Sequence, residues 1–283
     1  MSTFEKHINI EHEVTIIQAI EQECTLSHQQ IKNAINKGAL WLTRGKYTQR
    51  LRRIKKTLNI GDTLHFYYNE QVLAQIPLAA ELIEDCHQYS IWFKPYGMLS
   101  QGSKWSDHCT IARWAQTHLL PQRPAFIVHR LDRAATGLIL IAHTKSAATA
   151  LSRLFESRKL KKTYHIICLG QLEENHVMTI NEPIDNKTAI SHFNCLAYDS
   201  EKDLSFVEVT IETGRKHQIR KHAAFIGHPV FGDRLHNQMQ DNISESENLQ
   251  LCAAQLSFTC PLTLEQKTFE IPTHLDLSLN TLV

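Results

Sequence analysis

The sequence lacks several features that mark metal, redox and membrane proteins. Its seven cysteines include no Cys-x-x-Cys pair, so a zinc ribbon or a redox dithiol is unsupported. Its 17 histidines form no His-Glu-x-x-His, and we expect no metal site. The longest apolar runs, such as residues 138–142, are far shorter than the roughly 20 residues of a membrane span. The charged start has no apolar segment of the secretory kind, so we expect a cytoplasmic protein with reduced thiols that does not bind membranes.

The composition is that of an ordinary globular chain. A length of 283 residues exceeds a typical single domain, which predicts a large domain with a smaller one. The formal net charge is only +1, so overall charge does not indicate a nucleic-acid partner. Any such partner must be inferred from local clusters of charge.

Residues 1–78 are predicted to form the smaller domain. Apolar spacing predicts a helix over residues 14–23, and Ser27 can cap a second helix that stops at Gly38. Residues 39–42 and 63–67 are predicted to be short strands.

A basic segment, residues 44–56, lies between those two strands. It holds seven Lys or Arg and no acid. One interpretation is a solvated charged face. The other is an RNA contact, because a phosphate backbone relieves the mutual repulsion of like charges. On the second interpretation the expected RNA-binding residues of the segment are Lys46, Arg50, Arg52, Arg53, Lys55 and Lys56.

From about residue 79 the pattern is mixed α and β. Helices are predicted over 145–157 and 216–226. Strands are predicted over residues 89–94, 137–142, 163–169 and 205–211.

Three residues stand out in this second part. Asp132, between two arginines just before a strand, is either a salt-bridged carboxylate or a cleft residue. Tyr164 shares a strand face with apolar residues, which by itself favours a core aromatic. Arg220 lies in a basic stretch that could be a solvated helix face.

The segments around these residues resemble RluA-type RNA pseudouridine synthases. HRLDRAATGLILIA (129–142) is similar to the family's His-Arg-Leu-Asp-x-x-Thr-Ser-Gly signature, except that Ala135 and Thr136 replace the Thr and Ser. KKTYHIICLG (161–170) and TGRKHQIRKHAAFIGHPVFGD (213–233) match two further segments. A weaker match, WFKPYGMLSQGS (92–103), contains Lys94, which is either structural or a phosphate contact.

The resemblance implies an α+β fold for residues 79–283: a mixed, largely antiparallel sheet with flanking helices and a central cleft. TLSHQQIKNAINKGALWL and NIGDTLHFYY in residues 1–78 resemble an S-four-like RNA-binding domain, a small α/β module. The Val-Asn-Gly hairpin usual in that module is replaced here by residues 42–45.

The resemblance also implies isomerisation of specific uridines in structured RNA, without a cofactor. Asp132 would attack the anomeric carbon or remove a neighbouring proton, and the sequence leaves both routes open. Tyr164 would stack on the flipped uracil, and Arg220 would keep Asp132 ionised. Arg130 would fill the vacated space or bind phosphate, and Arg133 would contact RNA.

We expect a monomer whose partner is RNA, with large-subunit ribosomal RNA placed before tRNA. A catalytically inert RNA-binding factor is the alternative from another class. A glycoside hydrolase normally uses a second carboxylate, and none accompanies Asp132 in its segment.

Overall fold

A computed structural model describes residues 2–237 and 247–281 of the chain. The chain divides into two compact units, residues 1–78 with 101–114, and residues 79–100 with 115–283. The first unit thus includes a segment that the sequence interpretation placed in the second domain. That segment is anchored locally: the Trp41 indole donates to the Lys104 carbonyl (3.0 Å), and the Lys104 ammonium lies 2.5 Å from Glu5.

The first unit is a four-stranded antiparallel sheet with helices against one face. The strand order is β1-β4-β2-β3. Its elements are β1 (Thr3–Asn9), α1 (Ile16–Glu21), α2 (His28–Asn36), β2 (Leu40–Arg44), β3 (Tyr47–Arg50), β4 (Thr63–Asn69) and α3 (Glu70–Ala74). Ser27 caps α2 as expected, within a reciprocal capping box with Gln30. Alternate residues of β4, such as Leu64 and Phe66, are buried against the helices.

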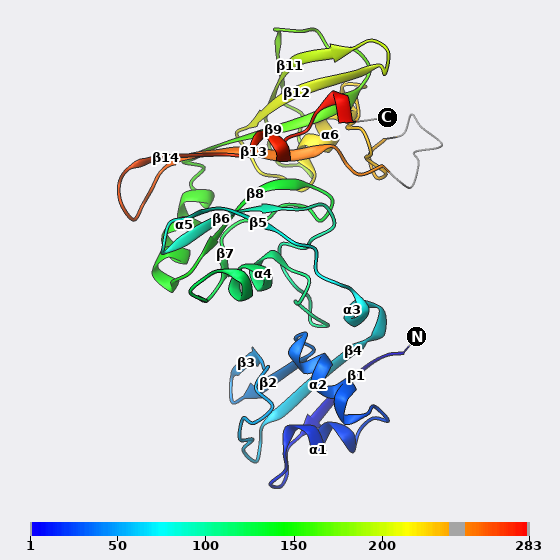
Figure 1. Cartoon of the computed structure of the whole chain (residues 1–283), viewed down its shortest axis with the longest axis vertical. Helices are drawn as coiled ribbons and strands as arrows, with labels where there is room; N and C mark the ends of the chain where they lie inside the picture. Colours follow the sequence, from blue (N-terminus) through cyan, green and yellow to red (C-terminus); the bar gives the residue numbers. More distant parts are fainter. Residues whose placement is uncertain (1, 238–246, 282–283) are drawn as a thin grey trace. The chain divides into compact units, whose positions relative to one another are not determined.

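The second unit is built on a large mixed sheet (Figure 1). Its main path runs β10-β11-β12-β9-β13-β8-β6-β5, with β14 added to β13 and β7 to β8. The strands are β5 (Glu81–Asp85), β6 (Tyr89–Lys94), β7 (Phe126–Ile127), β8 (Thr136–Ala142), β9 (Leu160–Leu169), β10 (Val177–Ile180), β11 (Ser191–Asp199), β12 (Leu204–Ile211), β13 (Leu251–Thr259) and β14 (Gln266–Glu270). Within the described residues, all of these pairs are antiparallel except β8 with β13. The predicted mixed, largely antiparallel sheet is confirmed; the central cleft stays a prediction.

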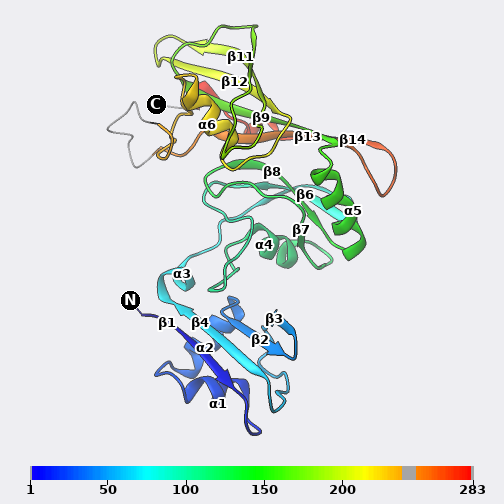
Figure 2. The same ribbon diagram turned by 180° about the vertical axis from the view of Figure 1, so that it is seen from behind.

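Two helices cover different parts of this sheet (Figure 2). α5 (Lys145–Glu156) packs its apolar side on residues of β6, β8 and β13, whereas α6 (Gln218–Phe225) packs on β9, β11 and β12. α4 (Ile111–His118) crosses the boundary between the units in sequence. Two short 3-10 turns, Thr273–Leu275 and Leu279–Thr281, follow β14. No helix in the described part of the chain is long and apolar enough to cross a membrane.

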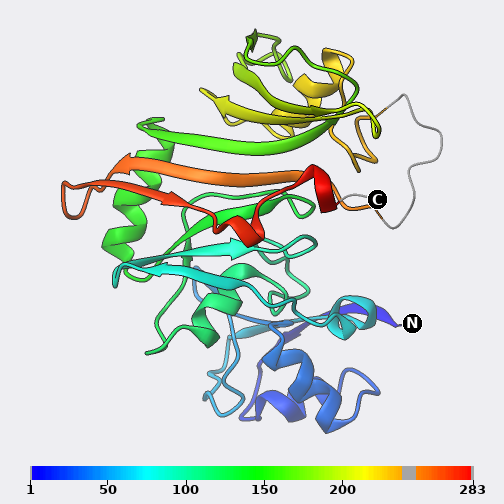
Figure 3. The ribbon, with the colours of Figure 1, turned by 45° about the horizontal axis from the view of Figure 1, so that its top comes forward.

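The middle of the sheet depends on a close approach between β8 and β13. Figure 3 shows β9 and β13 running side by side, and β13 is paired on its other edge with the start of β8. At this crossing Gly137 has φ +107°, and a Cβ there would lie 2.4 Å from the backbone of Ala253. Only glycine fits this position without displacing β13. Asp132 lies five residues before this crossing, so the start of β8 fixes the end of its loop.

Candidate active site

The Asp132 loop joins β7 to β8, and its first anchor is His129. The Nε2 atom of His129 accepts a hydrogen bond from the Leu140 amide in β8 (3.0 Å), and its ring stacks on Phe155 of α5 with centroids 4.2 Å apart. Burial lowers the pKa of His129 to about 3, so the ring is neutral and keeps Nε2 as an acceptor. The histidine of the signature is therefore a structural support for the loop.

A second anchor is the segment from Lys94 to Ser100. Ser100 Oγ donates to the Leu131 carbonyl (2.7 Å) and accepts from the Leu131 amide (3.0 Å). The Gly97 amide donates to the Arg133 carbonyl (2.9 Å). These bonds hold the two residues on either side of Asp132 and fix where its side chain emerges.

Lys94 completes this support from inside the protein. It is fully buried, and its ammonium donates to the carbonyls of Met98 (3.0 Å) and Pro95 (3.1 Å). Burial lowers the pKa of Lys94 to about 7, against the opposing attraction of Asp132. Of the two interpretations of Lys94, the structure supports the structural one, because a fully buried ammonium cannot meet a phosphate.

The Asp132 carboxylate lies beside two side chains of the segment that begins α6. Its Oδ2 is 3.9 Å from Nη1 of Arg220 and 3.7 Å from Nε2 of His217. The Asp132 side chain is 35% exposed, whereas that of Arg220 is only 5% exposed. A solvent-accessible carboxylate held beside a buried cation is available to a reacting group.

Arg220 has another, closer partner, Asp233. Nε and Nη2 of Arg220 donate to the two Asp233 oxygens at 2.8 and 2.5 Å. Burial acts to raise the pKa of Asp233, but the bonds from Arg220 and from backbone amides bring it below its ordinary value. The guanidinium fork is thus occupied by Asp233, and only Nη1 faces Asp132. The expected pairing of Arg220 with Asp132 stays a prediction, and the structure adds Asp233 as a second, closer partner of the guanidinium.

His217 and Asp233 are the members of the cluster that the sequence interpretation did not assign. Nδ1 of His217 lies 2.9 Å from Nε2 of His236, and the Asp233 Oδ1 atom accepts from the His236 amide (3.2 Å). Both residues lie within the matched segment 213–233, which was the available indication. Their roles depend on the turn at residues 233–236, which folds back onto the start of α6. A local sequence pattern does not show that long-range contact.

Tyr164 lies on β9 and packs, half-buried, on the same apolar cluster as Ile166 and Cys168. Burial and the negative charge of Asp132 raise the pKa of the Tyr164 phenol. Its hydroxyl has no hydrogen-bond partner among residues 2–237 and 247–281. Tyr164 is therefore an un-ionised ring within electrostatic reach of Asp132, and its stacking role stays a prediction.

The two departures from the family signature do not disrupt the loop. Ala135 is buried in that same apolar cluster, where a hydroxyl would need a partner. Thr136 Oγ1 lies 3.3 Å from the Leu251 carbonyl and can donate to it.

The expected RNA-binding residues differ in their exposure and in their partners among the described residues. Arg130 and Arg133 are exposed beside Asp132. Lys46, Arg53 and Lys55 are exposed and Lys56 is partly so. Arg50 and Arg52 share one carboxylate, that of Asp107, and also donate to backbone carbonyls, so both side chains already have partners within the protein.

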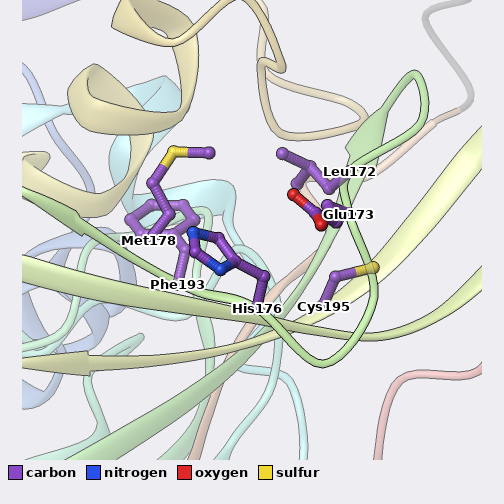
Figure 4. Close-up of a pocket in the computed structure, with 6 residues that line it drawn as sticks. All are labelled: Leu172, Glu173, His176, Met178, Phe193 and Cys195. Atoms are coloured by element: carbon purple, nitrogen blue, oxygen red, sulfur yellow. The ribbon is translucent and has the colours of Figure 1, made fainter.

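Two further features of the described structure bear on where the site lies. No group of three or more His, Cys, Asp or Glu among the described residues could hold a metal ion. A small pocket near β10 and β11 contains none of the predicted site residues (Figure 4). Its lining residues are Leu172, Glu173, His176, Met178, Phe193 and Cys195.

Comparison with known proteins adds independent information. The family model described as RNA pseudouridylate synthase matches residues 88–225. The dual-specificity RNA pseudouridine synthase RluA of Haemophilus influenzae is 35% identical over 156 residues, which cover 50% of this chain and 70% of that protein. The tRNA pseudouridine synthase C of Pectobacterium carotovorum is 30% identical over 174 residues, 51% of this chain. The chain spans less than half, 46%, of the Pectobacterium protein.

A solved structure agrees with this at the level of the fold. Human RNA Pseudouridylate Synthase Domain Containing 1 superposes with a TM-score of 0.58 at 19% identity, covering 69% of this chain and 83% of the human one. The predicted pseudouridine synthase fold is thereby confirmed. The family match covers the Asp132 loop, β9 with Tyr164 and α6 with Arg220. The chain belongs to the RNA pseudouridine synthase family, and within it to the RluA type.

Proposed function

We propose that this protein isomerises uridine to pseudouridine in RNA, with Asp132 as the reacting carboxylate. The observation that carries the proposal is the accessible Asp132 carboxylate held between buried Arg220 and His217, within electrostatic reach of Tyr164. This arrangement lies inside the stretch that matches the family.

The reaction exchanges one bond to the sugar for another. In one route a carboxylate oxygen of Asp132 bonds to the anomeric carbon, and the bond to uracil N1 breaks with its electrons leaving on the base. In the other, the carboxylate takes the neighbouring C2′ proton, and the same bond to N1 breaks. In both, uracil turns and its C5 bonds to the anomeric carbon. As this bond forms, the Asp132 oxygen leaves with its electron pair in the first route, whereas the C2′ proton returns in the second. The C5 proton is then lost and N1 gains a proton. No electrons are gained or lost overall.

A base stacked in a helix cannot reach a carboxylate on the protein, so the uridine must be flipped out of the RNA. Tyr164 offers a ring on which the flipped uracil stacks. Exposed Arg130 is placed next to Asp132 and can fill the vacated space or bind phosphate. The cation Arg220 favours the ionised carboxylate that either route requires.

Asp132→Asn tests this proposal. The amide cannot act as nucleophile or base, so pseudouridine formation is expected to disappear while RNA affinity stays within about twofold of the wild type. Mass spectrometry of RNA from cells that express either version measures the product. Pseudouridine formed by the variant would contradict the assignment of Asp132.

We further propose that the first unit is an RNA-binding module and that the target is large-subunit ribosomal RNA. The resemblance of residues 1–78 to an S-four-like module supports this choice. Transfer RNA is the second candidate, because the Pectobacterium relative is named as a tRNA enzyme. Pseudouridine mapping of ribosomal and transfer RNA with and without the gene distinguishes the two: the lost site identifies the target.

An inert RNA-binding factor would not need the accessible carboxylate of Asp132. Nor would it need the buried Arg220–Asp233 ion pair beside that carboxylate. A turnover assay with purified protein and RNA separates the two functions, since an inert factor binds RNA and makes no pseudouridine.

A further inference from the structure

The two oxygens of the Asp132 carboxylate have different surroundings. Oδ2 faces both Nη1 of Arg220 (3.9 Å) and Nε2 of His217 (3.7 Å). Oδ1 has no partner in the part of the chain that the structure describes. We infer that His217 is a positioning residue that, together with Arg220, holds Oδ2 and leaves Oδ1 as the atom that reacts with the ribose. This inference rests on the proposed function.

The backbone places His217 for this role. It precedes α6 with φ +56°, a left-handed conformation that is uncommon for residues other than glycine. Its side chain lies between Asp132 on one side and His236 on the other, and is only 16% exposed. Uncommon backbone conformations persist where the surrounding structure requires them, often at functional sites.

Hydrogen bonding determines which nitrogen of His217 carries the proton. The charged groups that face its ring are Asp132, Arg220, His236 and Lys216. If His217 donated from Nδ1 to His236, its bare Nε2 would face the negative Oδ2. The favourable arrangement has His236 donate from Nε2 to Nδ1 of His217 (2.9 Å), so that His217 presents an N–H to Oδ2.

The ring can do this while neutral. Burial lowers the pKa of His217, against the attraction of Asp132, so the ring carries no charge at neutral pH. It then acts as an oriented donor, with its tautomer set by His236. The same turn, residues 233–236, supports both donors, because Asp233 holds Arg220 and His236 orients His217.

The assignment of Oδ1 holds for both routes. In one, Oδ1 forms the bond to the anomeric carbon and later leaves with its electron pair as C5 bonds to that carbon. In the other, Oδ1 takes the C2′ proton and returns it. In each case Oδ2 stays beside His217 and Arg220 at ion-pair distance, so the carboxylate need not rotate during the cycle.

Two substitutions of His217 separate donation from bulk. In His217→Gln the side-chain amide can donate from near the position of Nε2, whereas His217→Leu fills the space without a donor. The assay is single-turnover release of tritium from RNA labelled at C5 of uridine, measured across pH with RNA affinity determined in parallel. His176→Leu, an exposed histidine of the same unit, is the matched control.

We expect His217→Leu to slow the single-turnover rate by roughly tenfold to a hundredfold with RNA affinity unchanged, and His217→Gln to stay within about threefold of the wild type. His176→Leu should match the wild type.

Equal rates for the Leu and Gln variants would overturn the inference while leaving the proposed function intact. A wild-type protein that releases no tritium from any RNA would contradict the proposed function itself. If His217→Leu fails to fold, His236→Leu against His236→Gln decides in the same way: only the glutamine can still donate to Nδ1 of His217, and equal rates would again overturn the inference.

Discussion

Tyr164 shows at the scale of one residue how burial limits what a side chain can do. Its hydroxyl finds no hydrogen-bond partner in the described chain, and burial with the charge of Asp132 raises its pKa. A phenol in that state is a poor base at neutral pH, since it stays protonated. The flat ring is what remains to act on an RNA base.

We therefore expect the activity of Tyr164→Phe to stay within about tenfold of the wild type. Tyr164→Leu should lose at least about a hundredfold, because only phenylalanine retains an aromatic surface for stacking. Single-turnover tritium release measures both. Equal loss in the two variants would mean that the hydroxyl takes part in the chemistry.

His129 links the site to the stability of the fold. The folded protein binds a proton on this ring only near pH 3, whereas the unfolded chain binds it near pH 6.5. Because the unfolded state holds more protons between these values, the free energy of unfolding falls as pH drops through that window.

Replacing His129 by Gln, whose oxygen can accept the same bond from Leu140, should remove this contribution. Between pH 7 and pH 5 the wild type should lose about 2 kcal/mol more of its free energy of unfolding than His129→Gln. Urea unfolding at the two pH values measures the difference. Parallel losses in both proteins would show that His129 is not held neutral in the fold.

The residues of the candidate site differ in how well a sequence can reveal them. Asp132, Tyr164 and Arg220 each lie in a contiguous segment with a recognisable pattern, so the sequence could indicate all three. The Asp233 contact that occupies the Arg220 fork is different. It requires a turn to return to α6, and residue spacing alone does not determine that geometry.

At the scale of elements, the crossing of β8 and β13 is a tight steric constraint near the site. Gly137 carries φ +107°, and its position is blocked by the Ala253 backbone. Gly227, after α6, also has a positive φ (+81°), but a methyl group added there would meet nothing within 4 Å. Substituting Gly227 and Gly137 therefore separates the free-energy cost of a positive φ from the cost of a steric clash with the neighbouring strand.

Gly227→Ala should lower the free energy of unfolding by about 1 kcal/mol through its backbone alone. Gly137→Ala should lower it by about 3 kcal/mol or more, since the methyl also pushes on β13. Denaturant unfolding measures both. A similar loss at the two positions would mean that β13 yields without cost at the crossing.

Elements with strong local patterns were predicted well, and the others were not. The structure confirms strands at residues 89–94 and 137–142 and a helix starting at residue 145. β1 was not predicted, because Thr3–Asn9 is an edge strand in which charged and polar residues alternate with few apolar ones. The strand is defined by its antiparallel pairing with β4, a long-range contact that the local sequence does not indicate.

At the scale of the whole molecule, the basic segment shows how distant acids change the meaning of a charge run. Residues 44–56 contain no acid, but Asp62 binds Arg44, and Asp107 binds both Arg50 and Arg52. The sequence interpretation counted Arg50 and Arg52 as available to RNA. Lys46, Arg53 and Lys55 are exposed and have no ion-pair partner among the described residues, and the two lysines are the simplest of them to test.

If this segment contacts RNA, the free lysines should carry the effect of salt. The double variant Lys46→Gln, Lys55→Gln should weaken RNA binding and reduce the slope of log affinity against log salt by about 1.4 for two lost phosphate contacts. Filter binding at several salt concentrations measures the slope. The matched control is Lys145→Gln, Lys187→Gln, which removes the same charge from exposed positions in the second unit and should leave the slope nearly unchanged. Equal changes in the two double variants would show that RNA responds only to total charge. In that case residues 44–56 would be a solvated surface.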